Sequence, residues 1–342
     1  MSNKINVAVL GSTGYVGMEL VKILSNHENV NINFLGSDTI YDEYLTNIEN
    51  TNKYINLPLL KNNNSFNPLQ AEYVFLALPH AVSNKYVNSF YDKIKIIDLS
   101  ADFRLDSEDI YKQDYGDNHS CTQYLKNFVY GLAEINKNEI SKSNYIAVPG
   151  CYPTSVLLPL IPLLKKKLIK AEDIIIDTKS GYSGAGKKFN IKNIQSDNDM
   201  NFYNYNTNSH RHISEIKQEL SKNNLDNNLS FSFNPHILPC FRGMMSTIYC
   251  NLEINITKNE INEIFKNFDY TNYFIKFIQD NQKLDFFSVQ NTNFCKIKIF
   301  NHHSDNKIII VSNIDNLIKG AAGQAVQCFN LMANFEETKS LI

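Results

Sequence analysis

The N-terminal segment restricts the fold more than any other part of the chain. The strand-like segment over residues 5–10 ends in a continuous apolar run over 7–10, and an amphipathic helix is expected over residues 15–25. Gly11 and Gly14 lie between the two segments, and Gly17 lies in the first turn of the helix. A continuous apolar run predicts a strand buried on both faces. Glycines placed between such a strand and a helix let a pyrophosphate approach the backbone and the helix N-terminus. The segment therefore predicts a dinucleotide-binding domain, and a plain turn between strand and helix is the alternative.

The second strand indicates which dinucleotide is bound. "VNINFLGSD" ends in Gly36 and Ser37, without an acidic residue there, and Asp38 follows one position later. A carboxylate at this place binds the ribose hydroxyls of NAD, whereas a small polar residue leaves room for a 2′-phosphate. Ser37 therefore favours NADP(H), although Asp38 weighs against it. The loop residues expected to contact the cofactor are Gly11, Ser12, Thr13, Gly14, Tyr15, Val16 and Gly17.

The remaining segments predict two domains that differ in their order of strands and helices. "AEYVFLALPH", "IKIIDLSAD" and "NYIAVPGC" are strand-like, with a helix expected over 81–90, and this alternation predicts an α/β fold with a Rossmann-like parallel sheet over residues 1–150. Residues 151–316 carry many strands and fewer helices, which predicts an α+β catalytic domain with a mainly antiparallel sheet. A C-terminal helix is expected over 317–342, joined to the first domain, with its apolar residues close to one face.

Cys151 lies in "AVPGCYPTS", between the two predicted domains. Pro153 suits the first turn of a helix. A thiol at a helix N-terminus has a lowered pKa, which favours the nucleophilic thiolate. A lone cysteine is more often an inert core residue. The local chemistry leaves both interpretations open.

"NSHRHISEIKQEL" supplies the partner that a thiol nucleophile needs. His210 and His212 are two residues apart, which places both imidazoles on one side of an extended segment, with Arg211 between them. A helix is expected to start near Ser214, a candidate N-cap. A metal site is the rival interpretation, but two histidines without a third ligand at the right spacing are weak support, and no metal is expected.

Two further loops carry candidate ligand-binding residues. "SGYSGAGKK" at 180–188 follows a strand and is either a flexible loop or a place where an anionic ligand approaches the backbone. "DLSADFRL" ends a strand of the first domain, so Arg104 is expected at the carboxyl edge of the sheet. Its guanidinium can grip a phosphate or a carboxylate, and a surface ion pair is the alternative.

Composition excludes several classes of protein. The net charge of −2 gives no basic surface for a nucleic acid. The longest apolar run, residues 156–164, contains two prolines and is too short to cross a bilayer. Six scattered cysteines without a CxxC pair indicate reduced thiols in a cytoplasmic protein, and the first strand begins too early to leave room for a targeting peptide.

Nine motifs in order give the chain a resemblance to a known family. They are "GSTGYVG", "LALPH", "DLSADFRL", "VYGLAEIN", "PGCYPTS", "SGYSGAG", "HRHISEI", "RGMMSTIY" and "IDNLIKGAAGQAVQ". Nearly end to end, the chain resembles the N-acetyl-gamma-glutamyl-phosphate reductases, of the aspartate-semialdehyde-dehydrogenase-like superfamily. The resemblance implies NADPH-dependent reduction of N-acetyl-glutamyl 5-phosphate to the semialdehyde, with release of phosphate, in arginine biosynthesis. It also implies a homodimer or homotetramer built on the sheets of the second domain.

The resemblance assigns roles residue by residue. Cys151 matches the nucleophile that forms a thioester, and His210 and His212 match the acid/base and a substrate contact, without deciding which is which. Independently of the resemblance, Arg104 at the carboxyl edge of the sheet and Arg211 between the histidines are the candidate substrate-binding cations. The residues expected near the nicotinamide are Ser180, Gly181, Ser183, Gly184 and Asn316.

The chain departs from the family pattern at three positions. Ile213 and Ser214 stand where Thr and Pro are usual, and Tyr182 stands where smaller residues are usual. None of these changes removes a reacting group, so an active enzyme is expected. The alternatives are an aspartate-semialdehyde dehydrogenase, a catalytically inactive NADP-binding regulatory protein and, least well supported, a cysteine hydrolase.

Overall fold

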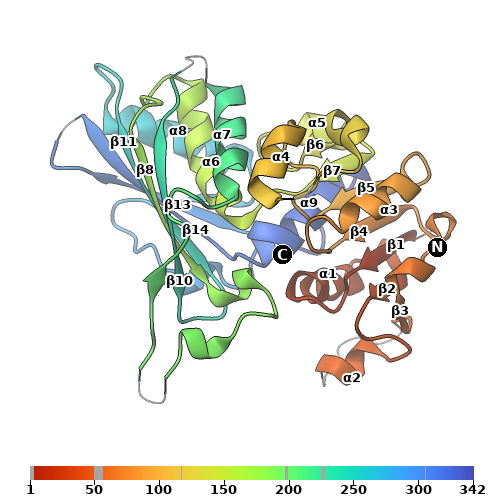
Figure 1. Ribbon diagram of the computed structural model, residues 1–342. Coiled ribbons are helices and arrows are strands. Elements are labelled where there is room, and N and C mark those ends of the chain that lie inside the picture. The colour runs from red at the N-terminus through yellow and green to blue at the C-terminus, as the bar shows by residue number, and fades with distance from the viewer. Residues whose placement is uncertain (1–3, 50–56, 117, 197–198, 225–227, 305) are drawn as a thin grey trace. The chain divides into compact units, whose positions relative to one another are not determined.

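The computed structural model describes residues 4–49, 57–116, 118–196, 199–224, 228–304 and 306–342 (Figure 1). The chain divides into two compact units. The first comprises Met1–Pro149 together with Ala321–Ile342, and the second comprises Gly150–Gly320. The first unit is therefore assembled from both ends of the chain, and the second is inserted between them.

The first unit is built on a parallel sheet of seven strands in the order β3-β2-β1-β4-β5-β7-β6. Their bounds are β1 Ile5–Leu10, β2 Val30–Ser37, β3 Leu60–Asn62, β4 Tyr73–Leu76, β5 Lys95–Asp98, β6 Val129–Tyr130 and β7 Tyr145–Ala147. This arrangement confirms the predicted Rossmann-like sheet. Five of the strands match the apolar segments identified above, and the short β3 and β6 are additional.

Helices cover both faces of this sheet, as the alternation of side chains along β1 requires. Val7 and Val9 belong to one hydrophobic core, together with residues of α1, α5 and α9. Ala8 and Leu10 belong to a second core, together with residues of α3. The helix bounds are α1 Tyr15–Ser25, α2 Leu45–Glu49, α3 Ser83–Phe90, α4 Glu108–Tyr115, α5 Lys137–Lys142 and α9 Gly323–Met332.

The second unit has a seven-stranded mixed sheet in the order β12-β13-β14-β11-β8-β10-β9. Its strands are β8 Ile174–Gly181, β9 Tyr203–Asn204, β10 Phe231–Leu238, β11 Met244–Asn251, β12 Ile275–Phe277, β13 Cys295–Asn301 and β14 Lys307–Ile314. Only the pairs β8/β10 and β12/β13 are parallel among the described ladders, so the predicted mainly antiparallel sheet is confirmed.

Three helices of this unit lie on one face of its sheet (Figure 1): α6 Cys151–Lys165, α7 His212–Asn223 and α8 Lys258–Thr271. α6 packs against β11 and β14, and α7 and α8 pack against α6. Of the fifteen residues of α6, twelve are buried, among them Pro159, one of its two internal prolines. The apolar run after Cys151 therefore forms the centre of this unit's helical layer.

The predicted C-terminal helix over 317–342 is wrong in its bounds and in its single apolar face. A π-helical turn, Ile318–Ala322, precedes α9, which ends at Met332, and Asn334 then adopts a left-handed conformation with φ of 57°. All ten residues of α9 are buried. Its polar side chains are accommodated by hydrogen bonds, such as that from Gln327 Nε2 to Glu134 Oε1 at 2.9 Å.

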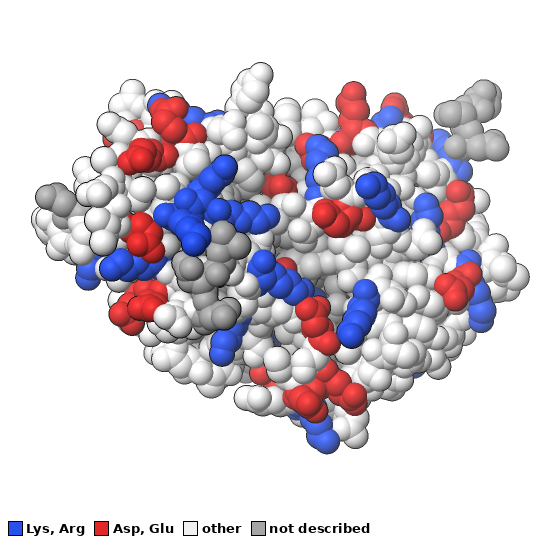
Figure 2. All heavy atoms as spheres, turned by 90° about the horizontal axis from the view of Figure 1, so that it is seen from above, with Lys and Arg blue, Asp and Glu red and all other residues white. Residues whose placement is uncertain are grey.

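Lys, Arg, Asp and Glu are interspersed over the face that Figure 2 shows, in keeping with the net charge of −2. Among the helices of the described residues, none combines the length and the apolar character that crossing a bilayer requires.

Candidate active site and cofactor loop

Cys151 is the first residue of α6. Gly150 caps the helix with φ of −67° and ψ of 157°, and its carbonyl oxygen accepts both the N–H and the hydroxyl of Thr154, each at 2.9 Å. Cys151 is partly buried and is not part of a disulfide. The thiol is therefore at the positive end of a helix dipole, as the motif predicts.

Gly320 lies directly against the nucleophile candidate. A methyl group added at Gly320 would lie 2.7 Å from Cys151 Cβ, so only a glycine fits without a shift. Gly320 belongs to the π-helical turn 318–322, and its N–H donates to the carbonyl oxygen of Asp315 at 2.9 Å. π-Helical turns are rare and often mark functional sites. Sequence reasoning missed this residue.

An aromatic cluster connects Cys151 to the two histidines. The ring of Tyr152 lies 5.3 Å from that of His210 and 5.9 Å from that of His212, between centroids, and the two imidazoles are 4.7 Å apart. The hydroxyl of Tyr152 lies 3.1 Å from that of Tyr205. Burial first, and then the charge on Cys151, raise the pKa of Tyr205 to about 12. The structure therefore gathers the thiol, both imidazoles and two tyrosines within the second unit.

His210 has a structural task of its own. Its Nδ1 accepts the N–H of His212 at 3.1 Å, so the helix α7 begins at His212. Ser214 as the N-cap is wrong, because α7 begins two residues earlier and its N-cap residue, Arg211, makes no side-chain capping hydrogen bond. Burial and then the charge of the neighbouring Arg211 lower the pKa of His210 to about 4. Arg211 itself is exposed.

Glu215 is a second residue that sequence reasoning left without a role. It lies in the first turn of α7, is 1% exposed, and its Oε1 accepts the N–H of Gly150 at 2.9 Å. The carboxylate thus contacts the residue that immediately precedes Cys151. The only signal in the sequence is its presence in the motif "HRHISEI".

The residues expected near the nicotinamide gather at the end of β8. Asn316 Nδ2 donates to Ser183 Oγ at 2.9 Å, and the N–H of Gly243 donates to Asn316 Oδ1 at 2.8 Å. A methyl group at Gly184 would lie 3.1 Å from Ser180 Oγ. The last residue of the strand, Gly181, is more restricted, since a methyl group there would lie 2.7 Å from a backbone oxygen.

The glycine turn of the first unit fits a pyrophosphate. Gly11 has φ of +78°, and a methyl group at Gly17 would lie 2.1 Å from the carbonyl oxygen of Gly11. The helix therefore approaches the end of β1 closely. The first intrahelical N–H of α1 is that of Met18, which donates to Gly14, so the amides of Val16 and Gly17 have no acceptor within the helix. Its first turn has no acidic residue. Such amides bind phosphate oxygens.

Side chains next to this turn fix its shape. The hydroxyl of Ser12 donates to the carbonyl oxygen of Gly36 at 2.9 Å, and the hydroxyls of Thr13 and Ser37 are 3.0 Å apart. Ser37 is 1% exposed and its Oγ also accepts the N–H of Ile40 at 3.1 Å. Ser37 thus shapes the loop after β2.

Arg104 follows β5 and is 9% exposed. Its Nε donates to the carbonyl oxygen of Val148 at 2.7 Å, and its Nη2 donates to that of Leu99 at 2.9 Å. The side chain thus braces backbone within the first unit. These hydrogen bonds of a buried side chain to backbone carbonyl oxygens differ from the surface ion pair that was the alternative prediction.

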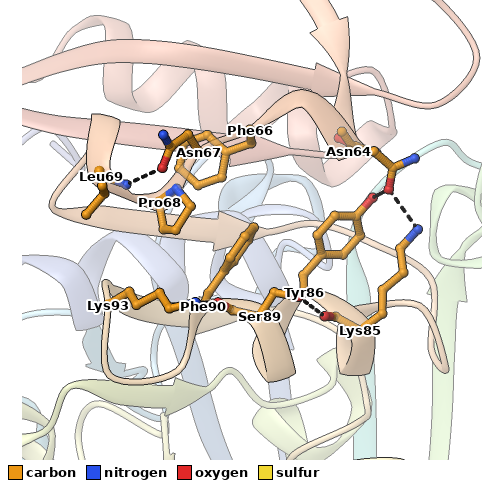
Figure 3. Close-up of a pocket in the computed structure, with 11 residues that line it drawn as sticks. Asn64, Phe66, Asn67, Pro68, Leu69, Lys85, Tyr86, Ser89, Phe90 and Lys93 are labelled. Carbon is orange, nitrogen blue, oxygen red and sulfur yellow. Dashed lines mark hydrogen bonds between the residues drawn. The ribbon is translucent and has the colours of Figure 1, made fainter.

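A separate cavity of about 640 Å³ lies in the first unit, between α3 and the segment that connects β3 to β4 (Figure 3). Phe66, Tyr86 and Phe90 form part of its wall, and Lys85 and Lys93 lie at its rim (Figure 3). None of the candidate site residues lines it. Within the ranges that the structure describes, no group of three or more His, Cys, Asp or Glu side chains could hold a metal ion.

Comparison with known proteins decides the family. Residues 6–143 match the family model "Semialdehyde dehydrogenase, NAD binding domain", and residues 151–316 match "Semialdehyde dehydrogenase, dimerisation domain". An N-acetyl-gamma-glutamyl-phosphate reductase of Ehrlichia canis is 42% identical over 100% of this chain and 98% of its own length. The reductase of Caldicellulosiruptor saccharolyticus is 43% identical over 99% of this chain and 98% of its own length.

The chain belongs to the N-acetyl-gamma-glutamyl-phosphate reductase family.

Solved structures similar to this family member share its fold. Aspartate semialdehyde dehydrogenase II of Vibrio cholerae, complexed with ASA, matches with a TM-score of 0.74 at 18% identity, over 97% of this chain and 99% of that one. An aspartate semialdehyde dehydrogenase with NADP from Candida albicans matches with a TM-score of 0.67 at 15% identity, over 99% of this chain and 100% of that one. Identity this low supports the shared architecture, and the closer curated relatives support the reductase family over the dehydrogenase.

Proposed function

We propose that this chain reduces N-acetyl-glutamyl 5-phosphate to N-acetyl-glutamate 5-semialdehyde and phosphate, with NADPH, in arginine biosynthesis. Membership of the reductase family supports the substrate. The observation that carries the chemistry is the placement of Cys151 at the start of α6, with Tyr152 in contact with both His210 and His212. A catalytically inactive protein has no need of this cluster.

Cys151 is the proposed nucleophile. Its thiolate attacks the acyl carbonyl carbon, the bond to the phosphate oxygen breaks, and inorganic phosphate leaves behind a thioester. The oxyanion formed during attack requires N–H donors. Pro153 has no N–H and that of Thr154 donates to Gly150, so the amide of Tyr152 is the candidate donor that follows Cys151 in this turn.

NADPH, when bound, supplies the hydride that reduces the thioester carbonyl. His212 is the proposed acid that protonates the resulting oxyanion to give a thiohemiacetal; it then takes this proton back as the carbon–sulfur bond breaks, so the Cys151 thiolate leaves and the aldehyde forms. His210 is the proposed orienting residue, because its Nδ1 is occupied by the N–H of His212 and its pKa of about 4 keeps the ring neutral. Exposed Arg211 is a proposed contact for the substrate's anionic groups.

The first unit is the proposed NADP-binding domain, with the helix returning from the C-terminus, and the second is the proposed catalytic domain. The amides of Val16 and Gly17 would hold the pyrophosphate, because the helix leaves them without internal acceptors, and Tyr15 would lie beside it at the start of α1. Thr13 and Ser37 would face the adenosine side. Ser180, Gly181, Ser183, Gly184 and Asn316 would hold the nicotinamide end. Arg104 is proposed to shape the substrate site through the backbone that it braces.

The reverse reaction tests this function. Purified protein should oxidise N-acetylglutamate semialdehyde in a phosphate-dependent manner, faster with NADP than with NAD. Aspartate semialdehyde serves as the competing substrate. A preference for aspartate semialdehyde would support the alternative activity, that of an aspartate-semialdehyde dehydrogenase. Absence of turnover with either aldehyde would favour the inactive regulatory protein.

A second copy of the chain is the proposed partner, through the sheet face that α6–α8 leave uncovered. Four apolar residues lie side by side across this face, since Tyr249 is in register with Ile175 and Ile309, and Ile309 with Phe300. Ile175 is 50% exposed, Tyr249 37% and Phe300 39%. A contiguous apolar row on a sheet face is typical of an interface. A homodimer through this face is expected, with a homotetramer as the larger assembly.

Light scattering coupled to gel filtration tests the interface. The substitution Ile175→Asp should shift the protein towards the monomer. The control Ile254→Asp introduces the same charge at an 81% exposed residue outside the sheet and should leave the mass unchanged. Equal masses for both variants would exclude this face. The proposed compartment is the cytoplasm, where the six free thiols remain reduced.

A further inference from the structure

Glu215 joins the two elements that carry the nucleophile and the imidazoles. Its Oε1 accepts the N–H of Gly150 at 2.9 Å. Gly150 immediately precedes Cys151, and Glu215 lies three residues after His212 in α7. One buried carboxylate therefore ties the start of α6 to the start of α7.

The Gly150 N–H lies outside the hydrogen bonds of α6, because Gly150 takes part in the helix only through its carbonyl oxygen. The residue is buried, and a buried N–H without an acceptor costs free energy. Without the carboxylate, the turn can relieve this cost by rotating, and a glycine rotates readily because it has no Cβ. Cys151 is the next residue and would move with the turn.

We propose that Glu215 is a positioning residue for the reaction: it fixes the Gly150 turn and thereby the orientation of Cys151 relative to His212. The inference rests on the proposed role of Cys151 as nucleophile. Glu215 acts through the Gly150 backbone, since that is where its Oε1 hydrogen bond goes.

Glu219 provides a matched control on the same helix. It lies one turn after Glu215 and is 4% exposed. Its Oε1 accepts from Lys222 Nζ at 2.8 Å and from Gln218 Nε2 at 2.9 Å, so it is bonded within α7. Removing either carboxylate disturbs a buried acid of α7, but only Glu215 bonds to the residue before Cys151.

The experiment compares Glu215→Gln, Glu215→Ala and Glu219→Ala by kcat, KM and the rate of Cys151 alkylation by iodoacetamide across pH. A shift of an ångström at a reacting group can cost about 100-fold, so Glu215→Ala should lose about that factor in kcat, with KM little changed. Glu215→Gln keeps an oxygen acceptor of the same reach and should restore most of the activity. Glu219→Ala should remain close to the wild type.

The alkylation profiles separate position from charge. Glu215→Gln and Glu215→Ala remove the same charge, so a difference between their profiles reports the position of the thiol. We expect the midpoint of the Glu215→Ala profile at higher pH than that of Glu215→Gln, because the displaced thiolate loses stabilisation by the helix N-terminus.

Identical kcat and identical profiles for the two Glu215 variants would overturn the proposal, as would equal losses in Glu215→Ala and Glu219→Ala. If Glu215→Ala cannot be recovered folded, Glu215→Asp, whose side chain is one methylene shorter, replaces it in the same comparison. The alkylation comparison does not require turnover. A wild-type protein that is alkylated at Cys151 but fails the phosphate-dependent assay would therefore refute the proposed function alone.

Discussion

Gly320 and Cys151 are packed so closely that a methyl group on the glycine would lie 2.7 Å from Cys151 Cβ and 3.2 Å from its Cα. Real Cβ atoms do not approach to 2.7 Å, so any larger residue must displace either the π-helical turn or the start of α6. The π-helical turn can lie this close to Cys151 because Gly320 has no side chain.

Gly320→Ala should therefore disturb the nucleophile. We expect kcat to fall by about 100-fold, as for a displacement of an ångström at a reacting group, and iodoacetamide to alkylate Cys151 more slowly. Gly116→Ala is the control: Gly116 has φ of +77° and nothing within 4 Å of the added methyl group, so the change costs about 1–2 kcal/mol of backbone strain without a collision. A Gly320→Ala enzyme as active as the control would contradict this role.

Cys151→Ser should abolish turnover while leaving NADPH binding intact, because the hydroxyl is a poor nucleophile and the cofactor loop belongs to the first unit. The loss should reach several orders of magnitude in kcat. Fluorescence titration with NADPH measures binding separately from turnover. Cys250→Ser removes a buried thiol and serves as the control. Near-normal turnover in Cys151→Ser would exclude the thioester.

Burial of His210 makes folding stability dependent on pH. Its pKa falls from 6.5 to about 4 on folding, so between these values the unfolded chain binds more protons than the folded chain. Stability should therefore decline as the pH falls from 6.5 to 4. At about 1.4 kcal/mol per pH unit, the decline attributable to His210 approaches about 3 kcal/mol.

His210→Asn tests this dependence, because the amide oxygen can replace Nδ1 as the acceptor for the N–H of His212 without titrating. Urea unfolding of both proteins should show a smaller decline between pH 6.5 and 4 in the variant. Buried His27 and His119 also titrate with lowered pKa in both proteins, so their contribution cancels in the comparison. Parallel stability curves would show that His210 does not titrate as described.

Two glycines of the cofactor loop should respond differently to a methyl group. At Gly17 it would collide with the Gly11 carbonyl oxygen at 2.1 Å, whereas at Gly14 the nearest atom lies 3.5 Å away, an ordinary contact. Gly17→Ala should therefore lower the melting temperature. Gly14→Ala should melt near the wild type yet bind NADPH at least about tenfold more weakly, a loss of about 1.4 kcal/mol. Unchanged binding in Gly14→Ala would show that no phosphate approaches this face.

Local sequence patterns were sufficient to predict the elements that are long and apolar. β1 ends in a continuous apolar run that is followed by Gly11, and its burial on both faces follows from helices on both sides. β3 and β6 were missed because they span three and two residues and owe their existence to neighbouring strands. The N-cap of α7 was misplaced because Arg211 begins the helix without a side-chain capping bond, whereas sequence rules look for a short polar side chain at that position.

A site residue could be predicted where its own side chain is the reacting group, as in Cys151. The residues that surround it were not, since their roles arise from contacts between distant positions. Glu215 is 65 residues from Gly150, and Tyr205 is 53 residues from Tyr152. Gly320 gains its role from a collision that only the folded chain reveals. A single sequence contains no record of such distances.

The insertion of Gly150–Gly320 between two parts of the first unit has a consequence for synthesis on the ribosome. Ala325, Val326 and Phe329 of α9 belong to the core that also contains β1 and α1, and they are synthesised after the inserted unit. Domains usually complete their folding from the N-terminus onwards. Here the order is reversed: the inserted unit is translated in full while the unit that begins the chain still lacks part of its core.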